Sequence, residues 1–402
     1  MINVAVLGFG VVGSGTVEVL DRNSAKIAQS AGQDIRVKYI LDIRDFPESP
    51  YKNLLISDFE TILNDADIAV VVETIGGAAI AYDFTKRCLA AGKSVVTSNK
   101  ELVAAHGYEL LKLAAEMNAN YLFEASVGGG IPVIRPIAQC MAANQISEIY
   151  GILNGTTNYI LTEMVKNGAE FSDALADAQK KGYAEADPSA DIDGHDACRK
   201  ICILSSLAFG RHIYPQYVQS EGIRGITTDD VRFAERLGYK IKLLARARAS
   251  GDKAAIYVAP HLIKNDSPLA SVDGVMNSIV VRGNAVGDVM FYGAGAGKMP
   301  TASAVAADII DAVKHLRSRK LLGWDDGGEE SVADPALLES AWYVRTNATR
   351  EKVGHEFGEV IFADGDGPEI AFKTAFMTGR KARELLDRGI PALSLFRVLG
   401  EH

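Results

Sequence analysis

One segment of the chain, residues 182–200, places carboxylates and a lysine at spacings that proton-transfer chemistry can use. Its loop carries four acidic residues, Glu185, Asp187, Asp191 and Asp193. The loop leads into a helical pattern on which Asp196 and Lys200 stand four residues apart, and therefore on one face. Apolar residues on the same pattern predict a largely buried helix, so Lys200 is a candidate proton carrier. The simpler alternative is a surface ion pair beside an acidic loop.

A glycine-rich turn follows the first apolar run of the chain. Residues 2–7 are predicted to form a strand, and Gly8, Gly10 and Gly13 then give the spacing G-x-G-x-x-G at the start of a helical pattern over residues 11–28. Such a turn brings the backbone close to a pyrophosphate and directs a helix amino terminus at it. This context predicts a dinucleotide site, with an unliganded strand-to-helix turn as the alternative.

Strand and helix patterns alternate through the first 130 residues. Four further strands are predicted at residues 35–41, 68–72, 94–97 and 119–123, and helices at residues 79–91 and 100–117. This order predicts an α/β fold with a parallel, Rossmann-type sheet and right-handed crossovers. Ligands bind at the carboxyl ends of such strands, where this chain has polar and glycine-rich segments.

The choice of coenzyme stays open at this point. A carboxylate at the end of the second strand suits an adenosine ribose, whereas a nearby arginine suits a 2′-phosphate. The chain has both, because Asp42 follows the second predicted strand and Arg44 lies two residues further on. The residues therefore predict NADP or NAD without choosing between them.

Length and composition indicate an enzyme of more than one domain. The chain has 402 residues, 48% of them hydrophobic, which is enough for two or three domains. Its net charge of −9 argues against nucleic acid or an anionic membrane as a partner. We expect a cytoplasmic location because neither a signal peptide nor a transmembrane run is evident. The four cysteines lack C-x-x-C spacing and are expected to pack in a reducing compartment.

Several motifs, taken together and in order, resemble the homoserine dehydrogenase family. They are GFGVVGSG near the amino terminus, TSNKELVA at 97–104, EASVGGGIP at 124–132, GILNGTTNYIL at 151–161, GYAEADP with the later Asp and Lys residues from 182 on, and GAGAGKMPTASAV at 293–305. The resemblance covers about the first 320 residues. It implies an enzyme that interconverts L-homoserine and L-aspartate 4-semialdehyde, small-molecule substrates, with NAD or NADP.

The resemblance also implies roles for individual residues. Lys200 would donate a proton to the aldehyde oxygen, Glu185 would bind the substrate ammonium group, and Asp196 would lie beside the substrate. With Arg44 added from the reasoning above, the coenzyme contacts would be Phe9, Gly10, Val12, Gly13, Arg44, Thr97, Ser98, Lys100, Gly182 and Gly297. A monovalent cation such as Na⁺ would be held by Glu124 and the main-chain carbonyls of Val127, Gly129 and Ile131.

The chemistry of the reaction makes independent sense of these residue types. Hydride leaves a carbon only as the hydroxyl proton departs, so one group must exchange a proton, and a desolvated lysine can be tuned to do so. A substrate ammonium needs a fixed carboxylate as its anchor. Two roles are open for Lys100. It could lie beside the coenzyme, which we prefer, or it could be an alternative acid or base.

Three segments are expected along the chain. Residues 1–131, completed by a helix at about 301–318, form the NAD(P)-binding domain, and residues 132–300 form an α+β catalytic and dimerisation domain, which implies a homodimer or homotetramer. Residues 326–402 show a strand and helix rhythm similar to the βαββαβ order of the ACT domains that end many family members. The segment is short and lacks the usual ligand-loop signature, so a structural cap is the alternative.

Two other functions fit parts of the pattern. A different Rossmann-type dehydrogenase of an amino-acid aldehyde or hydroxy acid would share the coenzyme motif but not the set of Glu185, Asp196 and Lys200. A catalytically inactive nucleotide sensor is expected to have lost Lys200 or Glu185, and this chain has both.

Overall fold

Six strands form a parallel sheet at the amino-terminal end of the molecule. The computed structural model describes residues 1–318, 322–365 and 367–400, so residues 366, 401 and 402 of the predicted carboxyl-terminal segment lie outside it. The strands run in the order β3-β2-β1-β4-β5-β6, and every pairing is parallel, as predicted. Their bounds are β1 Ile2–Leu7, β2 Ile35–Leu41, β3 Leu55–Ile56, β4 Ile68–Glu73, β5 Ser94–Thr97 and β6 Tyr121–Leu122.

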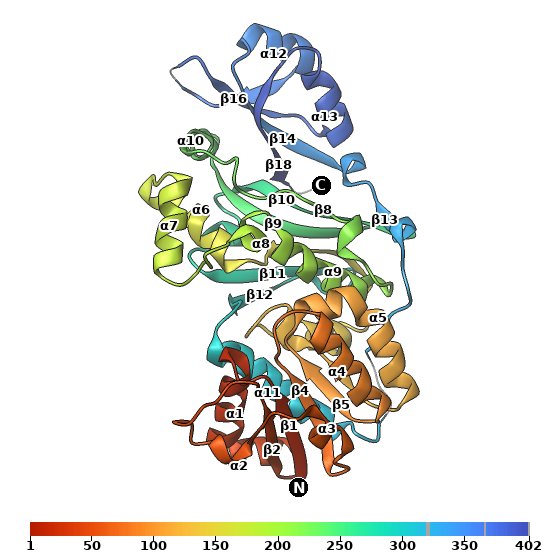
Figure 1. Ribbon diagram of the computed structural model, residues 1–402. Helices are drawn as coiled ribbons and strands as arrows, with labels where there is room; N and C mark the ends of the chain where they lie inside the picture. Colours follow the sequence, from red (N-terminus) through yellow and green to blue (C-terminus); the bar gives the residue numbers. More distant parts are fainter. Residues whose placement is uncertain (319–321, 366, 401–402) are drawn as a thin grey trace.

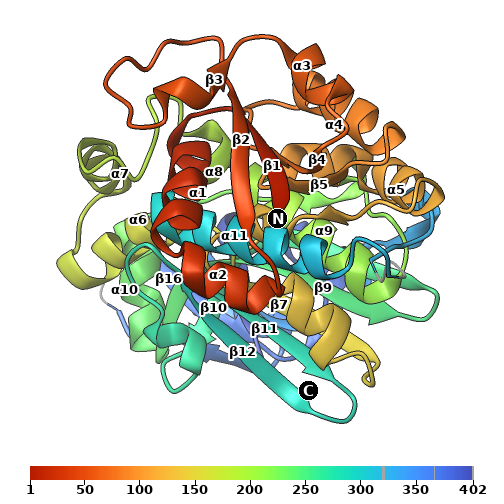
Figure 2. The same cartoon turned by 90° about the horizontal axis from the view of Figure 1, so that it is seen from below.

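Helices cover both faces of this sheet, as Figure 2 shows. On one face lie α1 (Val11–Arg22), α2 (Ser24–Ala31) and α11 (Lys298–Lys314), and on the other lie α3 (Phe59–Asn64), α4 (Ala79–Ala90) and α5 (Lys100–Glu116). Successive side chains of a strand point to opposite faces. Accordingly Val4 and Val6 of β1 pack in one apolar cluster while Ala5 and Leu7 pack in the other.

The helix predicted over residues 11–28 is wrong as a single element. It divides into α1 and α2 at Asn23, whose backbone (φ −104°, ψ 19°) leaves helical geometry. Asparagine is a poor residue for a helix interior because its side chain competes for nearby backbone groups, so it suits a boundary between two helices. The late helix α11 buries Ala302, Val305 and Ile309 in the same cluster as β1, although almost 300 residues separate them.

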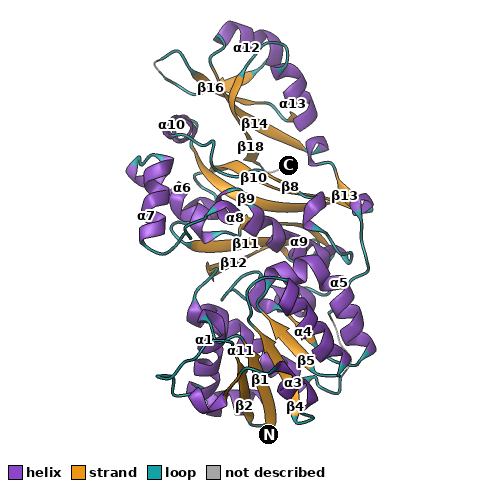
Figure 3. Ribbon diagram, viewed as in Figure 1, coloured by secondary structure: helices purple, strands orange, loops and turns teal. Residues whose placement is uncertain are grey.

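A larger sheet occupies the middle of the molecule, where Figure 3 shows long strands behind several helices. Its order is β12-β11-β7-β9-β10-β18-β14-β16-β15, and its pairings are mixed. The strands from the middle of the chain are β7 Ile146–Ile152, β8 Gln219–Ser220, β9 Tyr239–Ser250, β10 Lys253–Lys264, β11 Met276–Gly283 and β12 Gly287–Ala294. The helices are α6 Gly155–Asn167, α7 Phe171–Lys180, α8 Ser189–Ile192, α9 His195–Phe209 and α10 Thr228–Arg236. Of these, α9 packs on β7, β9 and β10.

The carboxyl-terminal segment lies at the far end of the molecule from the amino terminus (Figure 1). After β13 (Val332–Ala333) it runs β14 Glu339–Thr346, α12 Arg350–Phe357, β15 Val360–Phe362, β16 Ile370–Thr374, β17 Met377–Thr378, α13 Gly379–Leu386 and β18 Ala392–Leu399. Apart from the two-residue strands β13 and β17, this is the βαββαβ order. Because β18 pairs in parallel with β10, the segment extends the central sheet. Residues 370–378 form two short strands, β16 and β17, rather than one continuous strand.

Candidate active site

A single carboxylate joins two lysines where the two sheet domains meet. Asp196 lies in the first turn of α9, where a helix amino terminus favours negative charge. Its Oδ2 is 2.7 Å from Nζ of Lys200, one turn later, and its Oδ1 is 3.1 Å from Nζ of Lys100. Lys100 is the first residue of α5, which lies beside α9 (Figure 1). The sequence predicted the pair of Asp196 and Lys200, and the structure adds Lys100.

The opposite charges of this cluster favour the ionised forms of Asp196 and Lys100. Burial alone would raise the pKa of Asp196, but the ammonium groups of Lys200 and Lys100 outweigh it and hold that pKa well below its usual range. Burial alone would lower the pKa of Lys100, and attraction to Asp196 raises it instead. The side chain of Lys200 is only 10% exposed. At neutral pH Asp196 is therefore a carboxylate and Lys100 an ammonium.

Lys200 has one donor left for a substrate. An ammonium carries three N–H groups. One is directed at Asp196 and another donates to the main-chain oxygen of Leu153 at 2.8 Å. Because Leu153 directly follows β7, the larger sheet fixes the lysine from one side and α9 fixes it from the other. The third N–H is available to an oxygen atom in the adjoining cavity.

Two polar residues of this cluster were not assigned a role from the sequence. Nδ2 of Asn154 donates to Asp191 at 2.7 Å and to Asp196 at 3.0 Å, while its Oδ1 accepts the N–H of Thr157 and caps α6. Burial raises the pKa of Asp191. Available signals were the position of Asn154 in the GILNGTTNYIL motif and that of Asp191 in the acidic loop. The fold is what brings Asn154 and Asp191 together beside Asp196.

A cavity of about 540 Å³ adjoins the cluster and lies between the two domains. Many of the predicted site residues line it, namely Val12, Ser98, Lys100, Val127, Gly129, Gly182, Glu185, Asp196, Lys200 and Gly297. Asp191 and Asn154 line it too. Glu185 is exposed at its edge, as an anchor for a charged substrate group can be. The predicted residues Phe9, Gly10, Gly13, Arg44, Thr97, Glu124 and Ile131 lie outside this lining.

The glycine-rich turn has the geometry that a pyrophosphate requires. Gly8 has a φ of +91°, and a Cβ added to Gly13 would lie 1.9 Å from the oxygen of Gly8, so only glycine fits there. α1 begins after Gly10 with no side chain capping its first N–H groups. On one side of the turn Val12 reaches the cavity described above, and on the other Phe9 lines a second cavity of about 460 Å³. The residues present therefore fit a dinucleotide.

Asp42 and Arg44 form a tight pair beside this turn. The carboxylate of Asp42 accepts the N–H of Phe9 at 2.7 Å and two guanidinium N–H groups of Arg44 at 3.0 and 2.9 Å. The hydrogen bonds from Arg44 hold the pKa of Asp42 well below its usual range. Arg44 itself is 60% exposed and stacks on Phe46. The carboxylate at the end of β2 thus holds the arginine beside the glycine-rich turn.

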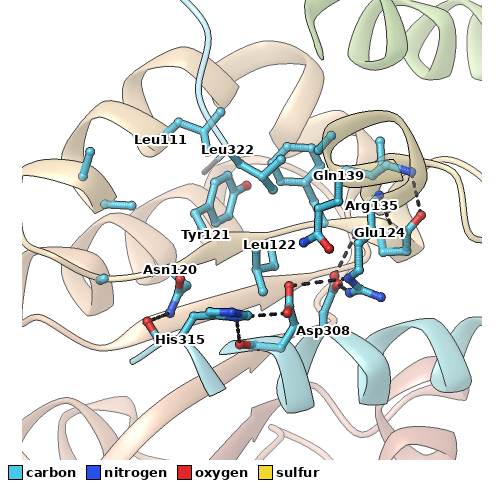
Figure 4. Close-up of a pocket in the computed structure, with 17 residues that line it drawn as sticks. Leu111, Asn120, Tyr121, Leu122, Glu124, Arg135, Gln139, Asp308, His315 and Leu322 are labelled. Atoms are coloured by element: carbon cyan, nitrogen blue, oxygen red, sulfur yellow. Dashed lines mark hydrogen bonds and ion pairs between the residues drawn. The ribbon is translucent and has the colours of Figure 1, made fainter. Parts of the chain in front are cut away.

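Glu124, the predicted cation ligand, lies at a separate small cavity of about 50 Å³ (Figure 4). Its carboxylate accepts the main-chain N–H groups of Val133, Ile134 and Arg135 at 2.6 to 2.8 Å. Beside it, Asp308 of α11 pairs with the guanidinium of Arg135 at 2.5 Å. A carboxylate has about four acceptor positions, so one remains on Glu124 for a cation. Val127 and Gly129 line the large cavity instead.

Neither a cluster of metal-ligating side chains nor a membrane-spanning helix occurs in the described part of the chain. Residues 1–318, 322–365 and 367–400 contain no group of three or more His, Cys, Asp or Glu side chains arranged to hold a metal ion. A site built chiefly from main-chain carbonyls needs no such group. None of the helices in these residues combines the length and apolar character needed to cross a membrane.

Two family models and a known relative match most of the chain. Residues 8–124 match the family model described as the NAD-binding domain of homoserine dehydrogenase, and residues 132–310 match the model of homoserine dehydrogenase itself. The chain is 44% identical over 355 residues to the homoserine dehydrogenase of Pseudomonas aeruginosa, which covers 86% of this chain and 82% of that protein.

Solved structures are similar over most or nearly all of the chain. A homoserine dehydrogenase from Thiobacillus denitrificans has a TM-score of 0.89 at 35% identity, covering 99% of this chain and 98% of that one. A hyperthermophilic archaeal homoserine dehydrogenase in complex with NADPH has a TM-score of 0.67 at 29% identity, covering 80% and 99%. The cofactor of this chain is a nicotinamide dinucleotide. From its domains, its site and these relatives, the chain belongs to the homoserine dehydrogenase family.

Proposed function

We propose that this homoserine dehydrogenase moves its proton through Lys200 and binds the substrate ammonium with Glu185. The observation that carries the proposal is the placement of Asp196, which holds Lys200 beside the cavity while its other oxygen holds Lys100 of the coenzyme domain. The carbon that gains or loses hydride must lie where the two domains meet, and Lys200, held by Asp196 and by the oxygen of Leu153, lines the cavity at that junction.

In the reductive direction Lys200 donates a proton to the aldehyde oxygen as that oxygen gains negative charge. A bound nicotinamide coenzyme supplies the hydride. Asp196 and the oxygen of Leu153 keep the lysine nitrogen in place, so little reorganisation is needed at the moment of transfer. Glu185 binds the ammonium group of L-aspartate 4-semialdehyde, at the end of the substrate away from the aldehyde.

An assay of nicotinamide oxidation with L-aspartate 4-semialdehyde, run separately with NADH and NADPH, tests the proposal directly. We expect turnover with both coenzymes. Turnover of another amino-acid aldehyde or hydroxy acid in preference to this pair would instead favour the related dehydrogenases named above.

Glu185→Gln should chiefly raise the apparent KM for homoserine, by about tenfold. Glutamine keeps the size of the side chain but removes the charge that pairs with the substrate ammonium, and a hydrogen bond between charged groups is worth about that factor. The measurement is steady-state kinetics in the oxidative direction. Asp187→Asn, on the same loop and also exposed, is the matched control and should leave KM unchanged. An unaltered KM in Glu185→Gln would remove Glu185 from the substrate site.

The paired Asp42 and Arg44 favour a coenzyme preference that is modest rather than absolute. Asp42 can accept a ribose hydroxyl, while the exposed guanidinium of Arg44 can turn to a 2′-phosphate. The relative in complex with NADPH makes NADP a natural first candidate.

Arg44→Ala should weaken NADPH binding by about tenfold and leave NADH binding nearly unchanged, since the lost contact is a charge-assisted one to phosphate. Titration of each reduced coenzyme by its fluorescence measures both constants. Arg36→Ala, an exposed arginine at the opposite end of β2, is the control. Equal losses for both coenzymes would mean that Arg44 does not read the 2′-phosphate.

The remaining assignments rest on the resemblance of the motifs. We propose a monovalent cation such as Na⁺ at Glu124 with the carbonyls of Val127, Gly129 and Ile131, consistent with the acceptor position that Glu124 retains. We also propose domain limits of residues 1–131 with the returning helix, 132–300 and 326–402, a homodimer or homotetramer, and a cytoplasmic location.

A further inference from the structure

A buried carboxylate that the mechanism does not use lies behind the active site. Glu73 is the last residue of β4 and is fully buried. Its Oε1 accepts the N–H of Ile75 at 2.6 Å, and its Oε2 accepts the hydroxyl of Thr97 at 2.5 Å. The second distance is in the range of a hydrogen bond to an ionised oxygen. Glu73 thus joins the carboxyl ends of two neighbouring strands, β4 and β5.

Thr97 links Glu73 to the loop that follows β5. Its Oγ1 accepts the N–H of Asn99 at 2.9 Å, so its single hydrogen is left to donate to Glu73. Asn99 then caps α5 by accepting the N–H of Leu102 at 3.1 Å. Its Nδ2 reaches back and donates to the oxygens of Ile75 and Gly77, at 3.2 and 2.7 Å, which belong to the loop after β4.

The loop held in this way carries two residues of the site. Ser98 lies between Thr97 and Asn99, Lys100 follows as the first residue of α5, and both line the large cavity. Lys100 also makes the contact with Asp196 that joins the two domains. A shift of Thr97 would therefore move Ser98 and the start of α5 together, without touching Lys200 or Glu185.

We propose that Glu73 is a positioning residue, whose carboxylate holds the Thr97–Lys100 loop in the arrangement that binds the coenzyme. The proposal rests on the placement of the coenzyme along Ser98 and Lys100. The ionised form suits this role because it accepts both donors at once. A protonated carboxyl group would turn one of its oxygens into a donor facing Thr97 or Ile75, each of which already donates to it.

The surroundings of Glu73 make its charge sensitive to pH near neutrality. Burial raises the pKa of Glu73 to about 7, while the hydrogen bonds from Thr97 and Ile75 act in the opposite direction. The titratable group that faces it from β6 is Tyr121, whose hydroxyl is buried and whose pKa is raised by burial and by the charge of Glu73. The neighbours on β1 and β5 are Leu7 and Thr97, neither of which is charged. Coenzyme affinity should therefore fall as the pH decreases through about 7.

The test measures the dissociation constant of NADH by fluorescence titration from pH 6 to pH 9. NADH is the probe because a 2′-phosphate would itself titrate near pH 6. Glu73→Gln keeps the size of the side chain but presents an amide donor to one of the two N–H or O–H groups. We expect about tenfold weaker binding at pH 8.5 and no change between pH 8.5 and pH 6.5, whereas the unaltered enzyme weakens over that interval.

Three further variants keep the result interpretable if Glu73→Gln does not fold. Thr97→Val removes the hydroxyl donor at nearly constant volume and should weaken NADH binding similarly, and Thr97→Ser should restore it. Glu109→Gln removes a half-buried carboxylate that binds Tyr82 and Lys86 in the same domain, so it controls for loss of charge. Its affinity and pH profile should match those of the unaltered enzyme.

Either of two outcomes would overturn the proposal. If Glu73→Gln and Thr97→Val bind NADH with the affinity and pH profile of the unaltered enzyme, Glu73 does not position the loop. Ser98→Phe tests separately whether the coenzyme lies along Ser98. If it does, the bulky side chain should weaken NADH binding. Unaltered binding by Ser98→Phe would overturn the placement itself.

Discussion

Lys200→Met should lower kcat by a factor on the order of 100 to 10,000, the usual contribution of general acid or base catalysis, while the coenzyme still binds. Methionine retains the apolar stem that packs within α9 but has no proton to exchange. The residual rate would come from substrate positioning and from the coenzyme domain, which the change does not reach. Steady-state rates in both directions, together with a fluorescence titration of NADPH, separate the loss of turnover from any loss of binding.

Lys100→Met decides which of the two lysines moves the proton. Both touch Asp196, but Lys100 starts a helix of the coenzyme domain, whereas Lys200 is held by Leu153 of the catalytic domain. We expect Lys100→Met to affect coenzyme binding and turnover together. Lys180→Met, on an exposed face of α7, is the control. Near-full turnover in Lys200→Met, with turnover abolished and coenzyme affinity intact in Lys100→Met, would reverse the two roles.

Local patterns predicted the parts of the site that lie close together in the chain. The pairing of Asp196 with Lys200 follows from a spacing of four residues on a helix, which the structure confirms. The parallel sheet likewise follows from apolar runs alternating with helical patterns. In both cases the relevant physics acts over one or two turns, or along one strand, so a single sequence contains it.

Contacts between distant segments could not be predicted in this way. Lys100 reaches Asp196 across 96 positions because the amino ends of α5 and α9 lie close together. Asn154, which caps α6, reaches it across 42. Nothing in the spacing of these residues indicates such a meeting. The hydrogen bond between Glu73 and Thr97 is similar, since it depends on β4 and β5 being neighbours in the sheet.

Two elements were missed although the sequence contained signals for them. No element was predicted over residues 228–250, where the structure has α10 and most of β9. A capping box joins Thr227 and Asp230 at the start of α10. In β9 the charged residues Lys242 and Arg246 alternate with apolar ones, which is typical of a strand with one polar face. That face is buried here, because Lys242 pairs with Asp273 and Arg246 pairs with Glu148.

Asp196→Asn should damage catalysis and stability together. The substitution keeps the shape of the side chain but leaves the ammonium groups of Lys200 and Lys100 without the carboxylate that both of them share. Removing one partner of a buried ion pair costs about 3 kcal/mol or more, because the other charge stays buried without compensation. Lys200 carries most of this cost, since Lys100 is 37% exposed and partly solvated. We expect kcat to fall and KM to rise, since Lys200 also loses its orientation.

The pH dependence of this loss distinguishes a missing charge from a general packing defect. The pKa of Asp196 lies below its usual range in the folded protein, so its stabilisation is complete above the pKa of the unfolded chain and is lost only as the pH falls through the folded value. The difference in unfolding free energy between the unaltered enzyme and Asp196→Asn should therefore be equal at pH 6 and pH 8, measured by urea denaturation. Asp187→Asn, which removes an exposed carboxylate of the same loop, should show no such difference. A fully stable and fully active Asp196→Asn enzyme would mean that Lys200 is held chiefly by the oxygen of Leu153.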